Sequence, residues 1–311
     1  MNNTTIGELV KYFRKKKGLS QENLAIGICS TRQIINIEKN MNLPTIDLLS
    51  HLSEALGVNL IEVYSDVSEH NGLETYLDYL KLDNAIANKK MNLIKEYVDA
   101  FEDREGFKTG VPRQLILHAK SIIYSVNGNI DIARECELEG IRTRHPSFSF
   151  EYSADEKYSE IDIAQMITYA VYLCRGGRNL EGLLLLEKTE DYIREVLDGS
   201  NYVVERKRPI WNNLWCSLVI NEYYFGKKIE KGFLQKIDDV LDYQVRSGRI
   251  YRVVELLLCK AAVLMRIKQK DKAMEVYQIS KSMAGIYYSY ERFKKEADSI
   301  INHLSDISLF E

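Results

Sequence analysis

The chain has 311 residues, of which 28% are charged and 45% are hydrophobic, and its formal net charge is −3. This length allows a sizeable buried core and suggests a small module joined to a larger one. The near-neutral balance excludes a histone-like polycation and a disordered acidic chain, so any contact with nucleic acid must be local.

Charge is distributed unevenly near the N-terminus. Residues 1–40 contain seven Lys or Arg and three Glu, whereas residues 41–69 contain five acidic residues and no Lys or Arg. A cationic segment followed by an acidic one is compatible with a small domain that contacts phosphate. This asymmetry makes the first seventy residues the place to look for a nucleic-acid contact.

The cysteines give no sign of a metal site. They are far apart and none has a histidine at ligand spacing: Cys29, Cys136, Cys174, Cys216 and Cys259. We therefore expect no structural zinc and no cofactor. The N-terminus lacks the basic start and apolar run of a secretion signal, and no stretch reaches the length of a membrane span. These features predict a cytoplasmic protein with reduced thiols and no membrane contact.

Apolar residues recur at helical spacing along the whole chain, which predicts an all-α fold. Five short helices are expected in the first domain, over residues 5–17, 21–28, 31–39, 44–56 and 60–64. Ser20 and Ser30 are suited to cap the second and third helices, and Gly18 and Gly57 to end the first and fourth in the left-handed conformation. Five such helices can form a compact bundle.

The helical segments become longer after Ser65, and we place a domain boundary near residues 66–72, between domains 1–66 and 67–311. Helices are then predicted over 73–86, 88–103, 112–126, 129–142, 158–175, 179–197, 205–225, 228–246, 249–267, 271–286 and 289–304. Most are joined by short polar or glycine-containing turns, as antiparallel neighbours require.

Two of these helix pairs carry the pattern of a helical repeat. One pair has bulky, small, aromatic and turn residues at Leu117, Ser121, Tyr124, Gly128, Ile130 and Ala133, and a later pair has Ala261, Leu264, Ala273 and Tyr277. The spacing resembles that of the 34-residue tetratricopeptide repeat. It predicts a tetratricopeptide-like array; an irregular helical bundle is the alternative.

The N-terminal domain carries a specific composite motif. It consists of GLSQENLA at 18–25, IINIEKN at 34–40, LPT at 43–45 and LGV at 56–58. Together these segments closely resemble the Xre/Cro-type helix-turn-helix over residues 5–64. The spacing from Gln21 to Glu38 is one residue shorter than in the commonest version, a feature similar to the PlcR and Rgg regulators.

The third helix of this motif has the dimensions to enter the major groove of B-DNA. Its outward residues are the candidate DNA contacts: Thr31, Arg32, Gln33, Ile35, Asn36 and Lys39. An arginine such as Arg32 suits guanine, and Asn36 or Gln33 suits adenine, while Ile35 and the Thr31 methyl can touch a thymine methyl. Gln21, at the start of the second helix, is placed to bind phosphate.

Several of these residues have simpler alternatives. Gln33 has the position to cap the third helix instead of contacting a base. The run from Arg14 to Lys17 can be a solvated helix end favoured by the helix dipole, an interpretation we prefer to phosphate binding. Glu38 is expected to make a structural link inside the domain, because its charge would repel phosphate.

Xre-type domains joined to tetratricopeptide-like bodies of this length are similar to the peptide-pheromone regulators of Gram-positive bacteria, the Rgg, PlcR and PrgX group. The resemblance implies that a short peptide binds in the groove of the array. In that group Asn side chains clamp the peptide backbone and charged residues hold its ends, and the candidates here are Asn213, Asn221, Arg175 and Arg252. The alternatives are solvated amides and internal ion pairs.

The leading hypothesis is a transcriptional regulator that binds a double-stranded DNA operator as a homodimer, since one such domain offers too little contact for tight binding. A signalling peptide would set its DNA affinity or oligomeric state. The alternative is a DNA-tethered interaction scaffold controlled by a partner protein. No constellation of residues suggests catalysis, so we do not expect an enzyme.

Overall fold

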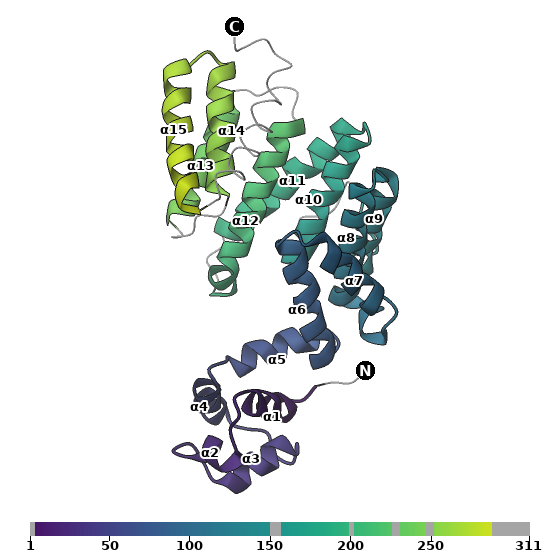
Figure 1. Cartoon of the computed structure of the whole chain (residues 1–311), viewed down its shortest axis with the longest axis vertical. Coiled ribbons are helices and arrows are strands. Elements are labelled where there is room, and N and C mark those ends of the chain that lie inside the picture. Colours follow the sequence, from purple (N-terminus) through teal and green to yellow (C-terminus); the bar gives the residue numbers. More distant parts are fainter. Residues whose placement is uncertain (1–3, 150–156, 199–201, 226–230, 247–251, 288–311) are drawn as a thin grey trace. The chain divides into compact units, whose positions relative to one another are not determined.

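A computed structural model describes residues 4–149, 157–198, 202–225, 231–246 and 252–287. The described chain is all-α, as predicted, with fifteen α-helices and one short 3-10 turn (Figure 1). It divides into two compact units, unit 1 with residues 1–146 and unit 2 with residues 147–311. Within the described ranges, no helix is both long and apolar enough to cross a lipid bilayer.

The first five helices form a small bundle at the start of unit 1, which we call the head. They are α1 (Ile6–Lys16), α2 (Gln21–Ala25), α3 (Thr31–Glu38), α4 (Ile46–Leu56) and α5 (Leu60–Glu69). This is the arrangement of five short helices that the sequence predicts.

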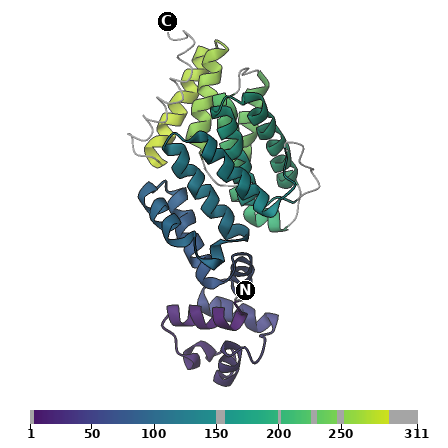
Figure 2. The same cartoon turned by 90° about the vertical axis from the view of Figure 1, so that its right-hand side faces the viewer.

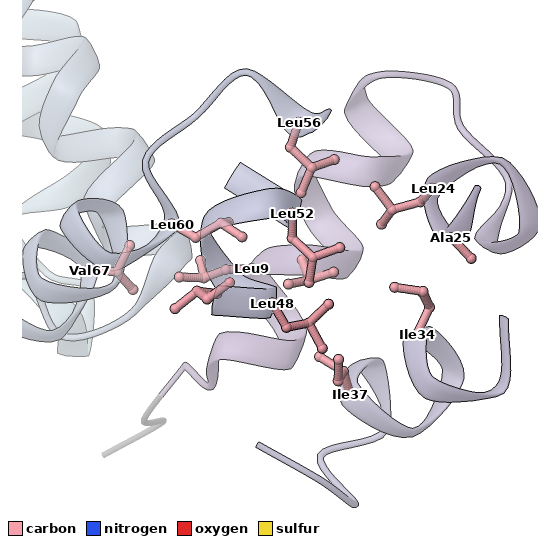
Figure 3. Packing of buried hydrophobic residues seen from close by; sticks show 12 residues of the cluster. Leu9, Leu24, Ala25, Ile34, Ile37, Leu48, Leu52, Leu56, Leu60 and Val67 are labelled. Carbon is pink, nitrogen blue, oxygen red and sulfur yellow. The ribbon is translucent and has the colours of Figure 1, made fainter. Parts of the chain in front are cut away.

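The core of the head takes at least one large side chain from every helix (Figure 3). Leu9 of α1, Leu24 of α2, Ile34 of α3, Leu52 of α4 and Leu60 of α5 are all at most 1% exposed. Each such side chain contributes about 1.5–3 kcal/mol by leaving water. The core therefore fixes the orientation of α3 relative to the other four helices.

The helix ends in the head follow from local chemistry. Gly18 and Gly57 both adopt the left-handed conformation, with φ of 70° and 68°, as predicted for the ends of α1 and α4. Ser30 Oγ accepts a hydrogen bond from the Gln33 amide at 3.3 Å and caps α3. A reciprocal capping box between Thr5 and Glu8 also begins α1, which the sequence analysis did not identify.

Two helices of the head differ from prediction by three residues or more. The second helix was expected to reach Ile28 but ends at Ala25, because Gly27 turns the chain with a φ of 75°. The fifth helix was expected to end near residue 64 but continues to Glu69. Val67 in this extension is fully buried against the head core, so the added turn is held by packing.

The remaining helices of unit 1 follow the head directly. They are α6 (Leu73–Ala87), α7 (Met91–Phe101), η1 (Glu105–Phe107), α8 (Gly110–Val126) and α9 (Ile130–Arg144). The turn between α5 and α6 lies in the segment where we expected a domain boundary, but the compact unit continues to residue 146. The division into domains 1–66 and 67–311 stays a prediction.

Hydrogen bonds fasten the α5–α6 turn to distant parts of unit 1. Asn71, with a φ of 59°, donates its side-chain amide to the backbone oxygens of Gly106 at 2.8 Å and Thr109 at 3.1 Å. The Leu73 amide donates to Thr4 Oγ1 at 2.9 Å. The turn is therefore anchored to the segment before α1 and to the segment before α8.

Unit 2 consists of further helices in sequential pairs (Figure 2). They are α10 (Glu160–Arg175), α11 (Asn179–Asp198), α12 (Tyr202–Phe225), α13 (Lys231–Arg246), α14 (Val253–Arg266) and α15 (Lys270–Tyr287). Consecutive helices pack on one another, most extensively α10 on α11 and α14 on α15. The helix predicted over 289–304 lies outside the described residues.

One turn geometry recurs between the paired helices of both units. Lys89, Gly128, Gly177 and Lys268 each have a φ between 54° and 84°. In every case the next residue donates its amide to a carbonyl five positions back, for example Asn129 to Tyr124 at 2.9 Å. This is the Schellman ending of a helix, repeated at corresponding places.

Small buried residues follow three of these turns at a constant distance. Ala133, Gly182 and Ala273 each lie five positions after the left-handed residue, and all three are buried. A Cβ on Gly182 would collide with Cys174 and with the Ala170 carbonyl, so the two helices cross closely there. The recurring unit agrees with the predicted helical-repeat architecture.

Candidate functional site

The third helix of the head presents one face to the core and the other outward. Ile34 and Ile37 are at most 1% exposed and point toward the other head helices (Figure 3). At its end, Asn40 adopts the left-handed conformation with a φ of 57°, and its Oδ1 accepts a hydrogen bond from Thr5 Oγ1 at 2.6 Å. Both ends of α3 are therefore fixed.

The predicted DNA contacts on α3 lie on its outward side. Arg32, Gln33 and Lys39 are exposed, while Thr31, Ile35 and Asn36 are half-buried. In Figure 1, α2 and α3 lie side by side at the end of the head away from α6. Within unit 1, the outer side chains of α3 are therefore accessible to a ligand as large as a DNA duplex.

A buried ion pair joins the last residue of α3 to α1. Arg14 on α1 donates to Glu38 at the end of α3 through two nitrogens, Nε to Oε1 at 2.5 Å and Nη2 to Oε2 at 2.8 Å. A third nitrogen, Nη1, donates to the Leu19 backbone oxygen at 2.8 Å. Bidentate geometry of this kind makes a strong and directional link between the two helices.

Gln21 completes the cluster, because its side-chain amide donates to Glu38 Oε2 at 2.8 Å. Glu38 therefore has the structural role that we predicted. Gln21, predicted to bind phosphate, is half-buried, and one of its amide hydrogens is engaged by Glu38, which leaves its oxygen and the other hydrogen available.

The pKa shifts of Arg14 and Glu38 show that each residue favours the charged form of the other. Burial acts to raise the pKa of Glu38, but the hydrogen bonds from Arg14 and Gln21 outweigh it and lower that pKa. The hydrogen bond to Glu38 raises the pKa of Arg14. Both residues are therefore charged over the whole neutral range, and each stabilises the other.

The cluster corrects one interpretation of the sequence. We expected Arg14 to belong to a solvated helix end with Lys15, Lys16 and Lys17, but Arg14 is only 8% exposed. The three lysines are exposed, and Lys17 Nζ donates to the Ala55 oxygen at the end of α4 at 2.9 Å. The signal that could have separated Arg14 from its neighbours is its position four residues after the buried Val10.

A second missed residue is Gly7, which lies where α1 crosses the end of α3. A Cβ at this position would collide with the Ile37 backbone oxygen and with Asn40. Only glycine lets the two helices approach this closely, so Gly7 helps to set the angle at which α3 is presented.

In unit 2 the structure brings two of the predicted peptide contacts to the same residue, Ser217 of α12. Arg252 Nη1 donates to Ser217 Oγ at 2.9 Å, and the Asn221 amide donates to the Ser217 backbone oxygen at 2.8 Å. Arg252 is the residue before α14 and has a φ of 51°, and its Nε lies 3.7 Å from Glu255 Oε1. Its side chain remains 35% exposed.

The structure describes less of the other two predicted peptide contacts. Arg175 is exposed in the last turn of α10. Asn213 lies on α12, but its side chain is outside the described residues. Arg252 and Asn221, with Ser217 between them, are the candidates whose contacts the structure describes, and all four residues stay predictions.

A second charged cluster, not identified from the sequence, joins three helices of unit 2. Lys236 of α13 lies between Glu190 of α11, at 2.5 Å, and Glu222 of α12, at 2.9 Å. Glu190 also accepts from the Trp215 indole at 3.1 Å and from Arg194 at 2.9 Å. Burial raises the pKa of Glu222 to about 7, although Lys236 acts against this.

Comparison with known proteins identifies the head. Residues 10–63 match the family model described as "Helix-turn-helix". The motif is one that reads DNA by placing its second helix in the major groove. The match covers α2 and α3 completely, so the predicted helix-turn-helix is confirmed. Comparison with curated protein sequences finds no significant match.

Solved structures share the fold over nearly the whole chain. A structure of PlcR from Bacillus thuringiensis in complex with the peptide PapR7 and DNA has a TM-score of 0.66 at 15% identity, covering 96% of this chain and 99% of that one. ComR from S. thermophilus, in complex with DNA and its signalling peptide, has a TM-score of 0.53 at 18% identity, with 97% and 99% covered.

A third similar structure is a putative transcriptional regulator from Listeria monocytogenes EGD-e. It has a TM-score of 0.56 at 14% identity, and 97% of this chain and 98% of that chain are covered. The likeness extends through both units, which confirms the predicted combination of a helix-turn-helix head with a tetratricopeptide-like helical body.

Proposed function

We propose that this protein is a cytoplasmic transcriptional regulator that binds a DNA operator as a homodimer through α3 and responds to a short signalling peptide bound in its helical body. The observation that carries the DNA-binding part is the outward face of α3. It presents Arg32, Gln33 and Lys39 to solvent while the opposite face is locked into the head core.

The chemistry of this face suits direct reading of bases. The Arg32 guanidinium can donate two hydrogen bonds to one guanine, and the amides of Gln33 and Asn36 can pair with adenine. The positive charge needed for phosphate contact is present on the exposed Lys39 at the end of α3.

The test of this part is the Arg32→Ala variant. We expect it to weaken binding to an operator selected in vitro from random duplexes by about 1–3 kcal/mol and to relax the preference at one base position. Lys39→Ala is the matched control, because Lys39 is exposed at the end of α3 and the loss of a phosphate contact weakens binding to all sequences alike. Wild-type affinity and selectivity of Arg32→Ala would contradict the assignment of α3.

The peptide-sensing part is supported by the shared fold with PlcR and ComR and by the Ser217 cluster. Arg252 has donors left after its bond to Ser217, and its partly exposed guanidinium is suited to a peptide carboxylate. Asn221 has its amide oxygen left to accept from a peptide backbone. Because a peptide can favour one arrangement of the helical array over another, it can alter how two heads fit one operator.

Synthetic peptides from small reading frames beside the gene provide the test. We expect one of them to bind with an affinity that Arg252→Ala lowers about tenfold or more, as for loss of a hydrogen bond to a charged group. Arg246→Ala is the control, since Arg246 is exposed on α13 and paired with Asp242. Operator affinity that stays constant at saturating peptide would remove the regulatory part and favour a scaffold controlled by a partner protein.

A further inference from the structure

Helix α6, the first helix after the head, takes its cap from a distant part of the chain. The helix begins after Gly72, which has a φ of 112° and no side chain to accept from the first amides of the helix. Thr4 Oγ1, 69 positions earlier, accepts a hydrogen bond from the Leu73 amide at 2.9 Å. The segment before α1 therefore caps a helix that lies outside the head.

The residue next to Thr4 fastens the same segment to the end of α3. Thr5 Oγ1 accepts from the Glu8 amide at 3.2 Å and donates to Asn40 Oδ1 at 2.6 Å, so this hydroxyl acts both as acceptor and as donor. Asn40 is the second residue after α3, which ends at Glu38. Thr4 and Thr5 together connect the end of α3 to the start of α6.

The head is attached to α6 at a second place, through α5. Tyr76 Oη of α6 donates to Asp66 Oδ2 of α5 at 3.2 Å, and the ring centroids of His70 and Tyr76 are 5.1 Å apart. These contacts hold α5, whereas the bond from Leu73 to Thr4 holds the segment before α1. Two separate attachments resist a rotation that one attachment allows, so both are needed to fix the orientation of the head on α6.

The orientation of the head matters most when two heads bind one operator. A single head can turn as a whole to fit one half-site. Two linked heads must fit half-sites about one helical turn apart, and each added base pair moves one half-site by about 3.4 Å and rotates it by about 35°. A fixed head therefore selects one spacing, whereas a loosely attached head accepts several at a lower effective concentration.

We propose that Thr4 is a positioning residue for DNA binding, because it fixes the orientation of the head on α6 and with it the half-site spacing that a pair of chains accepts. The inference rests on the proposed binding of a two-fold operator by a homodimer. In this role Thr4 contacts neither a base nor a phosphate, and it acts through the Leu73 amide.

The experiment compares the full chain with its Thr4→Val variant on a single half-site and on two-fold operators of different half-site spacing, using sequences selected in vitro. Valine has nearly the shape of threonine but cannot accept a hydrogen bond from Leu73. We expect half-site affinity to stay unchanged and affinity at the best spacing to fall about 2- to 10-fold, as for loss of one neutral hydrogen bond. Inserting one base pair should cost the variant less affinity than it costs the wild type.

The controls separate positioning from folding. Thr4→Ser keeps the hydroxyl and should restore the wild-type dependence on spacing. Thr143→Val is the matched substitution, because Thr143 is also half-buried and its Oγ1 donates to the Glu139 oxygen at 3.0 Å within α9. It should leave affinity for every duplex unchanged. Hydrogen exchange of the Leu73 amide should be faster in Thr4→Val than in Thr143→Val, which reports loss of the cap without DNA.

Two results on DNA would overturn the proposal. An equal loss on the half-site and on the two-fold operator would mean that the segment before α1 contacts DNA or stabilises the head itself. An unchanged dependence on spacing in Thr4→Val would mean that the contacts of α5 alone fix the head.

Failure of the underlying DNA-binding function gives a different result. In that case the wild-type chain selects no operator, and the role of Thr4 in DNA binding is rejected with it, although the Leu73 amide still exchanges faster in Thr4→Val. A wild-type chain that binds two half-sites equally well at every spacing retains the DNA-binding function and rejects the positioning role.

Discussion

The head and unit 2 both bury charged side chains between helices, but the charges are matched in different ways. In the head, one arginine and one carboxylate form a bidentate pair, Arg14 with Glu38. In unit 2, Lys236 is shared by Glu190 and Glu222. The comparison teaches that the head depends on both of its charges being present, whereas in unit 2 burial favours the neutral form of Glu222, so that cluster can bind a proton there.

The largest effect is expected from breaking the pair in the head. Arg14→Ala leaves the Glu38 carboxylate buried with Gln21 as its remaining partner, and we expect the head to lose about 3–5 kcal/mol of stability. Both tryptophans, Trp211 and Trp215, are in unit 2. The loss should therefore appear as an early unfolding transition in far-ultraviolet circular dichroism that tryptophan fluorescence does not follow.

Lys15→Ala, one residue along and exposed, is the control for the arginine variant and should change stability by less than about 0.5 kcal/mol. If both variants unfold as the wild type does, the ion pair contributes nothing to the head. That result would contradict the statement that the stability of the head depends on both charges.

A smaller loss is expected where α1 crosses α3. Gly7→Ala places a methyl group against the Ile37 oxygen, and we expect a cost of about 1–3 kcal/mol, as for other overpacked sites. Gly232→Ala is the control, because a Cβ at Gly232 on α13 meets nothing within 4 Å. That variant should be neutral or stabilise unit 2 by up to about 1 kcal/mol. The measurement is the midpoint temperature of thermal unfolding. A lower midpoint for Gly7→Ala and an unchanged or higher midpoint for Gly232→Ala would agree with the structure, and equal shifts in the two midpoints would not.

The smallest effect concerns pH and belongs to unit 2. The folded-state pKa of Glu222, about 7, lies above its ordinary value of 4.5, so the folded form binds more protons than the unfolded form between these values. Stability therefore falls as pH rises through this range. Raising the pH from 6 to 8 should lower the free energy of unfolding of unit 2, followed by tryptophan fluorescence, by about 1–2 kcal/mol.

Glu222→Gln should remove most of this dependence, because it takes away the group that titrates. Asp242→Asn, on the exposed side of α13, should keep it. The single histidine of unit 2, His303, is far along the chain from the cluster. A pH dependence that survives in Glu222→Gln would assign the effect to another group and contradict the proton-binding role of this cluster.

Much of the head was predictable because its signals are local. Ser30, Gly18 and Gly57 define helix ends through their own backbone or cap chemistry, and the alternation of Ile34 and Ile37 with polar residues defines the outer face of α3. The roles of residues that act across the fold were harder to predict. The extension of α5 was missed because Val67 stands among polar residues, although it continues the helical spacing of Leu60 and Val63.

Arg14 shows the limit most clearly. It stands in a row of four cations, and residue type alone does not separate it from Lys15; only its position above Val10 on the helix turns it toward Glu38. The mutual contacts of the candidate residues in unit 2 were even harder to predict. Arg252 and Asn221 meet at Ser217 because α12 and the start of α14 lie together, a tertiary arrangement that the spacing of 31 residues does not encode.

The anchoring of Asn71 has a practical consequence for exchanging parts between regulators of this fold. Its amide holds the α5–α6 turn to Gly106 and Thr109, more than thirty residues downstream. A chimera that transplants only residues 1–72 would separate the Asn71 side chain from both acceptors and leave the orientation of the transplanted head unconstrained by these bonds. A transplant cut after residue 146 would keep Asn71 together with both acceptors. It would therefore preserve the orientation of α3 relative to the rest of unit 1.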